Sequence, residues 1–292
     1  MRLCLIGCLF FVVVACKLEI PETDRTQFST EPTVASVPIG QIDTVSGLAD
    51  SRSQPGNLWA IQAKDTAASL TMLGHDGQIE GQLKVPKFSN RDWEDLAIGP
   101  GPNPGTTYLY IGDIGDQDRQ YGISQVYRLP EPSTLKTEIT QIERINFRYP
   151  DGPQDARAMF VDPLTNDIYI IANRQPNVHL YRLAYPQNIN EITLAEAYGE
   201  LPISPVVSGA SISPDGREIV VRTYGQVFYW KRAVGQAVAD VMQKSNSRGA
   251  PLLPEPKGEA ICFDKDGEGY FTLSQRASAT SVNLYYYKKI AQ

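Results

Sequence analysis

The sequence predicts an all-β fold, a five-bladed β-propeller, on three observations. Five segments begin alike, with small or charged residues before apolar ones. The second residues of successive segments lie 48, 62, 52 and 50 positions apart in the chain. Each start is followed by a turn and then by β-prone runs, and only one stretch shows a helical period. Repeats of ~40–50 residues made of short strands are typical of propeller blades. The starts are Ser46–Ala49, Glu94–Ala97, Ala156–Met159, Ser208–Ser211 and Gly258–Ile261.

The runs after each start predict the outer strands of the blades. They are rich in β-branched and aromatic residues, which suit half-buried pleated sheets. Second strands are expected at Leu58–Ala63, Tyr108–Gly112, Ile168–Ala172, Glu218–Thr223 and Tyr270–Ser274. Third strands are expected at Ser69–Leu73, Gln125–Leu129, Val178–Leu183, Gln226–Trp230 and Asn283–Tyr287, and fourth strands at Gln78–Val85, Glu138–Tyr149 and Ile192–Leu201.

The stretch Val234–Lys244 has the helical period, with Val234, Val238, Val241 and Met242 on one face, so a short helix is expected after the fourth blade. The fifth repeat stops after its third strand, and Val34–Val45 precedes the first repeat without a blade of its own. We therefore expect this N-terminal strand to complete the last blade and close the ring, which removes exposed sheet edges. The propeller domain would span residues 34–292. A sixth blade within residues 95–157 is the alternative.

The first residues indicate an exported lipoprotein. Residues 1–15 combine Arg2 with an apolar run too short to span a membrane as a helix, which is typical of a signal peptide. The ending Val13-Val14-Ala15-Cys16 resembles a lipobox, so Cys16 is the expected lipidation site and residues 16–33 the lipidated tether. The resemblance implies a bacterial cell-envelope protein anchored to a membrane, with the periplasmic face of the outer membrane or the cell surface favoured. A membrane anchor or plain secretion is the alternative.

Composition excludes several classes of function. The formal net charge of −6 and a pI near 5.1 argue against a nucleic-acid partner, which needs a basic face. The two histidines, His75 and His179, exclude a multi-histidine metal site and disfavour Ser–His catalysis. After loss of the signal peptide and lipidation, Cys262 is the remaining thiol. Its apolar surroundings indicate a small buried hydrophobe rather than a nucleophile.

Blade topology predicts where binding residues converge. The innermost strands begin, and the second strands end, on the same face, around the mouth of the central channel. Loops on a rigid scaffold commonly carry binding groups. The strand starts supply Trp93, Glu94, Asp95, Asp155, Arg157 and Glu259, and the second-strand ends supply Lys64, Asp65, Asp113, Asp116, Asn173, Arg174, Arg222, Tyr224, Ser274 and Gln275. Of these, we take Trp93, Glu94, Asp95, Asp113, Asp155, Arg157, Arg174, Arg222, Tyr224 and Glu259 as candidate ligand-binding residues.

The Gly-Asp-rich segment 110–118 is the main candidate cation site; Asp264-x-Asp266-Gly267 also resembles a fragment of a calcium loop, but a plain hairpin is favoured there. The glycines of segment 110–118 permit tight turns, and the carboxylates of Asp113 and Asp116 could bind Ca²⁺, which takes six to eight oxygen ligands. The spacing is not that of an EF-hand, and Asx-type turns account for the pattern equally well. No other cofactor is expected.

The chain resembles a group of bacterial secreted propellers similar to SdiA-regulated-type and esterase-like phytase-type domains. The resemblance rests on Asp92–Ala97, Gly112–Asp116, Arg222–Tyr224 and Gly258–Ile261. It implies an acidic channel mouth, calcium binding in some members, and in some members hydrolysis of ester or phosphoester bonds. This chain departs from the pattern at Arg157 and Gln275, where relatives tend to carry glutamate. Both changes reduce the negative charge available to a cation, and arginine favours an anionic group.

Two functional hypotheses follow, and whether the chain is an enzyme stays open. The first is a cell-envelope binding module that holds a protein partner or a small anionic or carbohydrate ligand at the mouth. The second is a calcium-dependent hydrolase, with Asp95, Asp113 and Glu259 as cation ligands or acid–base groups and Arg157, Arg174 or Arg222 holding the substrate. We favour the first because the sequence shows no complete catalytic set.

Overall fold

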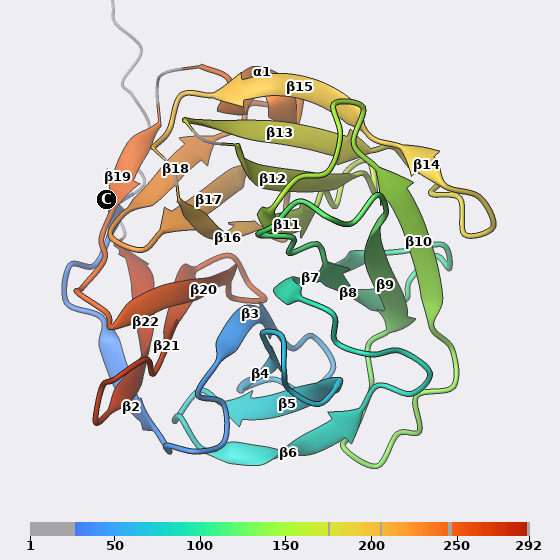
Figure 1. Cartoon of the computed structure of the whole chain (residues 1–292). Coiled ribbons are helices and arrows are strands. Elements are labelled where there is room, and N and C mark those ends of the chain that lie inside the picture. Colours follow the sequence, from blue (N-terminus) through green and yellow to red (C-terminus); the bar gives the residue numbers. More distant parts are fainter. Residues whose placement is uncertain (1–26, 175, 205, 245–246, 291–292) are drawn as a thin grey trace, which may run out of the picture.

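The computed structural model describes residues 27–290 except 175, 205 and 245–246, and these residues form five β-sheets arranged as blades around a central axis (Figure 1). The predicted signal peptide, Cys16 and most of the predicted tether lie outside the described residues. The fold class and the count of five blades predicted from the repeats are confirmed. The long 95–157 interval holds two extended loops rather than a sixth blade. No helix in the described part of the chain has the length and apolarity needed to cross a membrane.

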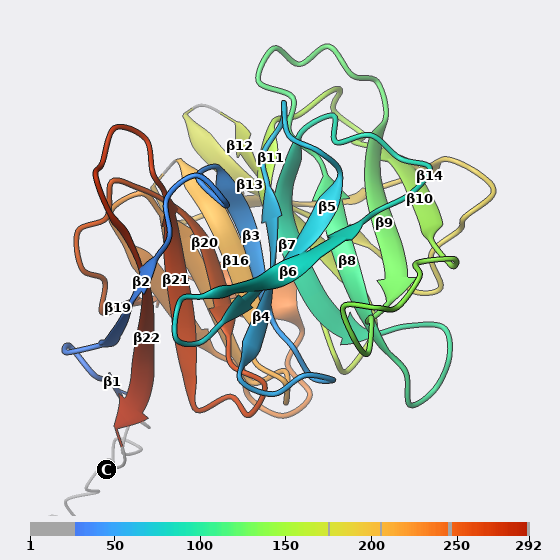
Figure 2. The same ribbon diagram turned by 90° about the horizontal axis from the view of Figure 1, so that it is seen from below.

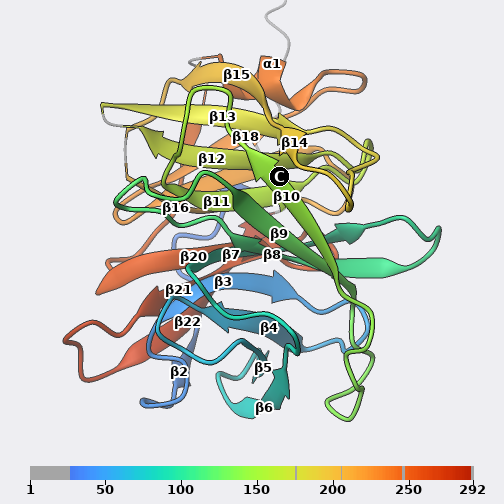
Figure 3. The same cartoon turned by 45° about the vertical axis from the view of Figure 1, so that its right-hand side comes forward.

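Blades 1 to 3 run outwards from the axis in chain order. Blade 1 contains β3 (Val45–Asp50), β4 (Asn57–Gln62), β5 (Ser69–Gly74) and β6 (Ile79–Lys84). Blade 2 contains β7 (Trp93–Pro100), β8 (Thr107–Asp113), β9 (Ser124–Pro130) and β10 (Glu143–Arg148), and β14 (Thr193–Leu194) adds a parallel edge beside β10 (Figure 3). Blade 3 contains β11 (Ala156–Val161), β12 (Ile168–Arg174), β13 (Asn177–Leu183) and β15 (Glu196–Leu201).

Blade 4 contains β16 (Val207–Ile212), β17 (Glu218–Thr223), β18 (Val227–Lys231) and β19 (Arg248–Ala250). Between β18 and β19 lies α1, which spans Val238–Met242 and is shorter than the predicted helix. Val234 is 84% exposed in the preceding loop, so the helical face predicted to include it begins four residues later. The three-residue strand β19 was not predicted, because its sequence Arg-Gly-Ala shows no apolar alternation.

Blade 5 closes the ring as predicted. It contains β20 (Lys257–Phe263), β21 (Gly269–Gln275) and β22 (Val282–Ile290), and β2 (Thr33–Val37) pairs antiparallel with β22 as its outer strand. The short β1 (Gln27–Phe28) also pairs with β22, and the two lie side by side in Figure 2. Phe28 is buried against Tyr229 and Tyr270. The fold therefore begins before the predicted domain boundary at residue 34.

Apolar side chains hold adjacent blades together. In the described part of the chain, five buried clusters fill the five interfaces between neighbouring blades. The thiol of Cys262 lies in the cluster between blades 5 and 1, which confirms its predicted burial. Burial of apolar surface drives this assembly, and each blade contributes both of its faces to it.

The inner strands share an irregularity that positions the site. Each of β3, β7, β11, β16 and β20 has a β-bulge near its start, which leaves one extra residue in the inner strand. The extra residues are Ser46, Glu94, Arg157, Ser208 and Glu259. Bulges re-aim side chains next to functional sites. The repeat alignment predicted from sequence is therefore wrong by one position in blade 2, where Glu94 rather than Asp95 is the equivalent of Arg157 and Glu259.

Candidate functional site

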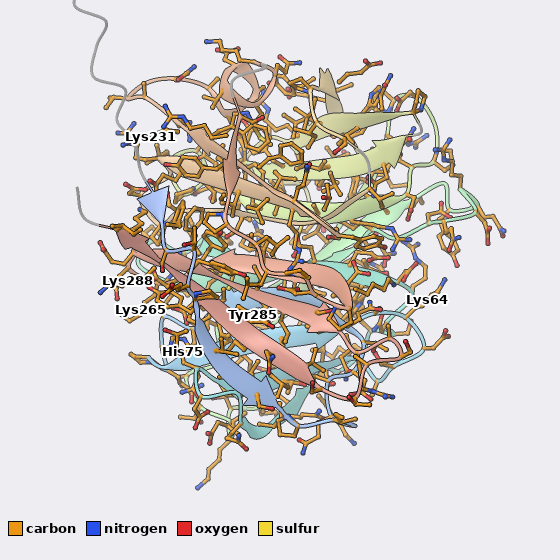
Figure 4. The ribbon with its side chains drawn as sticks, turned by 90° about the vertical axis from the view of Figure 1, so that its left-hand side faces the viewer. Lys64, His75, Lys231, Lys265, Tyr285 and Lys288 are labelled. Carbon is orange, nitrogen blue, oxygen red and sulfur yellow. The ribbon has the colours of Figure 1, made fainter. Side chains whose placement is uncertain are left out.

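An open depression of about 590 Å³ lies on the face where the inner strands begin. Residues from all five blades line it, as the topology predicted. Its polar lining includes Lys64, Asp92, Glu94, Gln117, Arg119, Asp155, Arg157, Asn173, Tyr224, Lys257 and Gln275. Charged groups of both signs therefore meet here from positions nearly 200 residues apart in the chain. Figure 4 shows Lys64 on this side of the molecule, opposite Lys231, Lys265 and Lys288.

Carboxylates form the floor of the depression. Glu94, supplied by the bulge of β7, is 4% exposed, and the Nη1 atom of Arg157 lies 3.4 Å from its Oε1. The Nε atom of Arg157 donates to Oδ2 of Asp155 at 3.0 Å. A Cβ atom on Gly115 would lie 2.5 Å from Oδ2 of Asp92 and 2.7 Å from Oε1 of Glu94. The glycine thus lets the backbone after β8 pass directly against two carboxylates.

Burial raises the pKa of the carboxyl groups on this floor. Desolvation raises the pKa of Glu94 well above its ordinary value, and the neighbouring carboxylates of Asp92 and Glu259 add to the rise. Arg157 opposes the increase but does not cancel it. The pKa of Asp92 is raised for the same first reason, desolvation, although Lys64 and Arg157 lower it in part. Perturbed carboxyl groups gathered in a concave site are a common mark of function.

Glu259, from the bulge of β20, is the least satisfied of these groups. Its side chain is buried, the residue being 1% exposed, and neither carboxyl oxygen accepts a hydrogen bond from the described residues. The ammonium of Lys257 lies 3.0 Å from Oε1, close enough for an ion pair but without hydrogen-bond geometry. Desolvation raises the pKa of Glu259, and Lys257 lowers it in part. Native proteins rarely leave buried polar groups so poorly paired, so this one needs an explanation.

The Lys257 side chain bridges several groups at the edge of the depression. Its Nζ atom donates to Oε1 of Gln275 at 3.1 Å and lies 5.9 Å from the centre of the Tyr224 ring. Tyr224, a predicted site residue, is 39% exposed and follows β17 on the mouth face. Neither Lys257 nor Arg119 was among the predicted residues. Lys257 could have been found, because it directly precedes the predicted inner-strand start at Gly258, and the inner strands begin on this face.

Asp95 lies beneath the mouth and has a structural role. Its carboxylate is fully buried and accepts backbone N–H groups of Leu96, Met159 and Ala210, at 2.8, 2.8 and 3.2 Å. It therefore ties together the inner strands of blades 2, 3 and 4. The equivalent positions in the other blades carry Gly47, Ala158, Gly209 and Ala260, which leave room for this side chain at the axis. Desolvation raises the pKa of Asp95 well above its ordinary value.

Arg222 is also placed away from the depression. It is fully buried between blades 4 and 5, where its Nη2 lies 3.1 Å from Oε2 of Glu255 and its Nη1 donates to the carbonyl of Ala260 at 3.0 Å. A Cβ atom on Gly258 would lie 1.7 Å from Arg222 Nη2, so only glycine leaves space for the guanidinium. Trp93 is likewise buried, beside Tyr127. These two predicted ligand-binding residues hold blades together in the structure.

The candidate calcium ligands have internal partners. Asp113 accepts the backbone N–H of Asp92 at 2.9 Å and the hydroxyl of Tyr127 at 3.1 Å. Both oxygens of Asp116 accept backbone N–H groups, from Gln120 and Tyr121, at 2.8 Å each. The described residues contain no group of three or more His, Cys, Asp or Glu side chains arranged to hold a metal ion. Arg174 ends β12 on the mouth side, and its side chain lies outside the described residues.

The fold and this depression define the protein as a five-bladed propeller with a charged channel mouth. No protein-family model and no curated protein matches the chain, so the resemblance to SdiA-regulated-type or phytase-type domains is not confirmed.

Three solved structures are similar to the chain at low sequence identity. A hydrazine synthase of Kuenenia stuttgartiensis is 9% identical with a TM-score of 0.43, covering 82% of this chain and 71% of that one. A nidogen/laminin complex is 10% identical with a TM-score of 0.46, covering 79% and 72%. An auxiliary nutrient binding protein of Bacteroides thetaiotaomicron is 8% identical with a TM-score of 0.47, covering 89% and 73%. With TM-scores below 0.5, they contribute nothing to the functional argument.

Proposed function

We propose that this chain is a cell-envelope binding module whose propeller holds a small polar ligand in the channel-mouth depression. The observation that carries the proposal is the convergence of buried, incompletely paired charged groups at one open concavity. Glu94 and Arg157 reach it from equivalent bulges of two inner strands, and Glu259, from the equivalent bulge of a third, lies buried beside Lys257, which lines it. A volume near 590 Å³ lies in the range of small-molecule sites, which are commonly ~300–1,000 Å³.

A binding role agrees better with the geometry than the calcium-dependent hydrolase. The carboxylates of Asp95, Asp113 and Asp116 already accept internal hydrogen bonds and do not converge on one point. Arg222 faces Glu255 between two blades rather than a substrate in the depression. The groups that do face the depression form a mixed-charge lining, which suits recognition of a polar molecule by complementary contacts.

Recovery of a bound molecule tests the proposal. The full chain would be purified from its native envelope, denatured, and the released small molecules identified by mass spectrometry. Arg157→Gln is the test variant, because Arg157 contacts Glu94 and Asp155 in the depression. Arg182→Gln is a matched control, because Arg182 also contacts two carboxylates, those of Asp167 and Glu196, on an outer strand. We expect the ligand with the wild type and Arg182→Gln, but not with Arg157→Gln. Equal recovery from all three, and from a Gln275→Leu variant that alters the other side of the lining, would reject the mouth as the site.

The predicted lipid anchor on Cys16 is tested independently of the binding function. Lipidation requires the thiol of Cys16, so labelled palmitate should be incorporated into the wild-type chain and not into Cys16→Ser. Cys262→Ser is the control, since that thiol is buried in the fold. Labelling that persists in Cys16→Ser would reject the lipid anchor while leaving the binding function open to its own test.

A further inference from the structure

The Lys257 ammonium occupies a small cation-binding arrangement at the edge of the depression. A carboxylate oxygen of Glu259 lies 3.0 Å from Nζ, the amide oxygen of Gln275 lies 3.1 Å away, and the ring of Tyr224 lies beside it at 5.9 Å. A carboxylate, a neutral oxygen acceptor and an aromatic face together are suited to a primary ammonium, which offers three donors and is attracted to ring faces. The groups come from β20, the end of β21 and the turn after β17.

The lysine holds this place loosely. Its side chain is 39% exposed, and its four rotatable bonds give the ammonium other positions in solvent. The carboxylate, by contrast, is buried and fixed on an inner strand. Departure of Lys257 would remove the ion pair of Glu259, because Arg222 is paired with Glu255 and Arg157 with Glu94 and Asp155. The arrangement is therefore built around the carboxylate and needs a cation, but it does not need this particular one.

The floor of the depression brings carboxylates and cations together. Asp92, Glu94 and Asp155 line it with Lys64, Arg119, Arg157 and Lys257, and Glu259 lies buried beside Lys257. A metal ion does not suit this mixed lining, since the described residues show no arrangement of three or more metal-ligating side chains. An organic cation needs fewer direct ligands and gains from the Tyr224 ring.

We infer that the depression binds a ligand through a primary alkylammonium group, which replaces the Lys257 ammonium between Glu259, Gln275 and Tyr224. The inference rests on the proposed binding function and names the chemical class of its ligand. It reverses the expectation of an anionic ligand, which followed from Arg157 when its two carboxylate partners were not known. Lys257 then acts as an internal substitute that keeps Glu259 paired until the ligand arrives.

Chemical complementation tests the inference. Lys257→Ala deletes the atoms Cγ, Cδ, Cε and Nζ, which correspond to n-propylammonium. We expect isothermal titration calorimetry on the full-length variant to show saturable binding of n-propylammonium at one site, with a dissociation constant in the millimolar range. The wild type should bind the probe at least about tenfold more weakly, because its tethered ammonium competes for the place. The neutral isostere 1-propanol should not bind either protein.

Two comparisons make the result specific. Lys265→Ala is the matched control: Lys265 contacts the exposed carboxylate of Asp266 at 2.6 Å on the opposite face, and this variant should not bind the probe. Adding Glu259→Gln or Gln275→Leu to Lys257→Ala should weaken binding about tenfold or more, because the first removes the negative charge and the second removes the amide oxygen acceptor. Gln275 is half-exposed, so its substitution tests the site even if Glu259→Gln perturbs folding.

The failures of the two proposals are distinguishable. The absence of n-propylammonium binding by Lys257→Ala, equal binding by the wild type, or insensitivity to both second substitutions would overturn the alkylammonium inference. A co-purified ligand without an amino group would also overturn it, but would leave the binding function intact. Ligand recovery unaffected both by Arg157→Gln and by Gln275→Leu would instead overturn the binding function at this mouth, because both residues line it.

Discussion

Both ends of the propeller channel carry buried carboxylates, but those carboxylates differ in how completely they are hydrogen-bonded. At the end where the inner strands finish, Asp50, Asp162 and Asp264 are all buried and all paired with donors. At the mouth, Glu94 and Glu259 are buried as deeply, yet Glu259 accepts no hydrogen bond from the described residues. The closed end has a central cavity of about 10 Å³, whereas the mouth has a depression of about 590 Å³.

Each closed-end carboxylate has a specific structural partner. Asp162 accepts hydrogen bonds from Nη1 of Arg232 at 2.9 Å to both of its oxygens. Asp50 contacts Nε2 of His75 at 2.7 Å and accepts the backbone N–H of Lys265 at 2.6 Å. Because such groups are fully paired, their burial stabilises turns and blade contacts. Burial of a charge therefore does not by itself identify a binding site, and the state of its hydrogen-bonding partners separates the two roles.

The largest expected effect is at the closed end. Asp162→Ala leaves the buried Arg232 guanidinium without its carboxylate, and breaking a buried pair in this way costs about 3–5 kcal/mol in the free energy of unfolding. Urea denaturation would measure the loss. Asp215→Ala, in the equivalent turn of blade 4 but exposed, should cost about 1 kcal/mol. Similar losses in the free energy of unfolding would show that the buried Asp162–Arg232 pair stabilises the fold no more than the exposed Asp215 does.

Asp95→Ala should have the next largest effect. The substitution leaves three buried backbone N–H groups without an acceptor, and each such group costs ~1–3 kcal/mol. We expect a loss of about 3 kcal/mol or more in chemical denaturation, with the blade fold retained in circular dichroism. A loss below about 1 kcal/mol would show that the axis is not held by this carboxylate.

Glu94→Gln should have a smaller, pH-dependent effect of opposite sign. Burial raises the pKa of Glu94 above its ordinary value of 4.5, so between that pH and the raised pKa the folded chain binds a proton that the unfolded chain has released. Wild-type stability therefore falls as pH rises through this window, and the amide removes the fall. The variant's Tm should exceed that of the wild type by about 2–4 °C at pH 8, and by less at pH 4.5.

Glu200→Gln, on an exposed outer strand, is the control for this pH series. Its Tm should follow the wild type at every pH. If Glu94→Gln does the same, the mouth carboxylates are stabilised as fully as those of the closed end.

The smallest expected effect is that of calcium. The oxygens of Asp113 and Asp116 already accept internal hydrogen bonds, so Ca²⁺ would have to displace them. We expect the Tm to move by less than about 1 °C with added Ca²⁺ or with a chelator. A reversible rise consistent with ~2.7 kcal/mol at a hundredfold excess over the dissociation constant would restore the hydrolase hypothesis.

The sequence was sufficient for the architecture, because repeat spacing and strand periodicity are local signals that every blade reports. It also placed Glu94, Arg157, Tyr224 and Glu259 at the mouth, since blade topology brings those positions to one face. It could not separate Glu94 from Asp95. A bulge of one residue sends the first to the depression and the second to the axis, and no residue type in the repeat marks where the bulge occurs.

The role of Arg222 was hidden for a different reason. Its partner Glu255 lies outside the repeated strands, and the space for its guanidinium depends on the absence of a side chain at Gly258. Charged residues at strand ends look alike in a sequence whether they face water, a ligand or another blade. Only the packing of blades 4 and 5 shows that this one is enclosed.

The position of β1 gives the molecule a polarity. Gln27 pairs with Ile290 at the far end of β22, so the chain enters the fold at the closed end, an inner-strand length of ~20 Å away from the mouth. Any attachment through residues before Gln27 therefore joins the propeller at the end opposite its mouth.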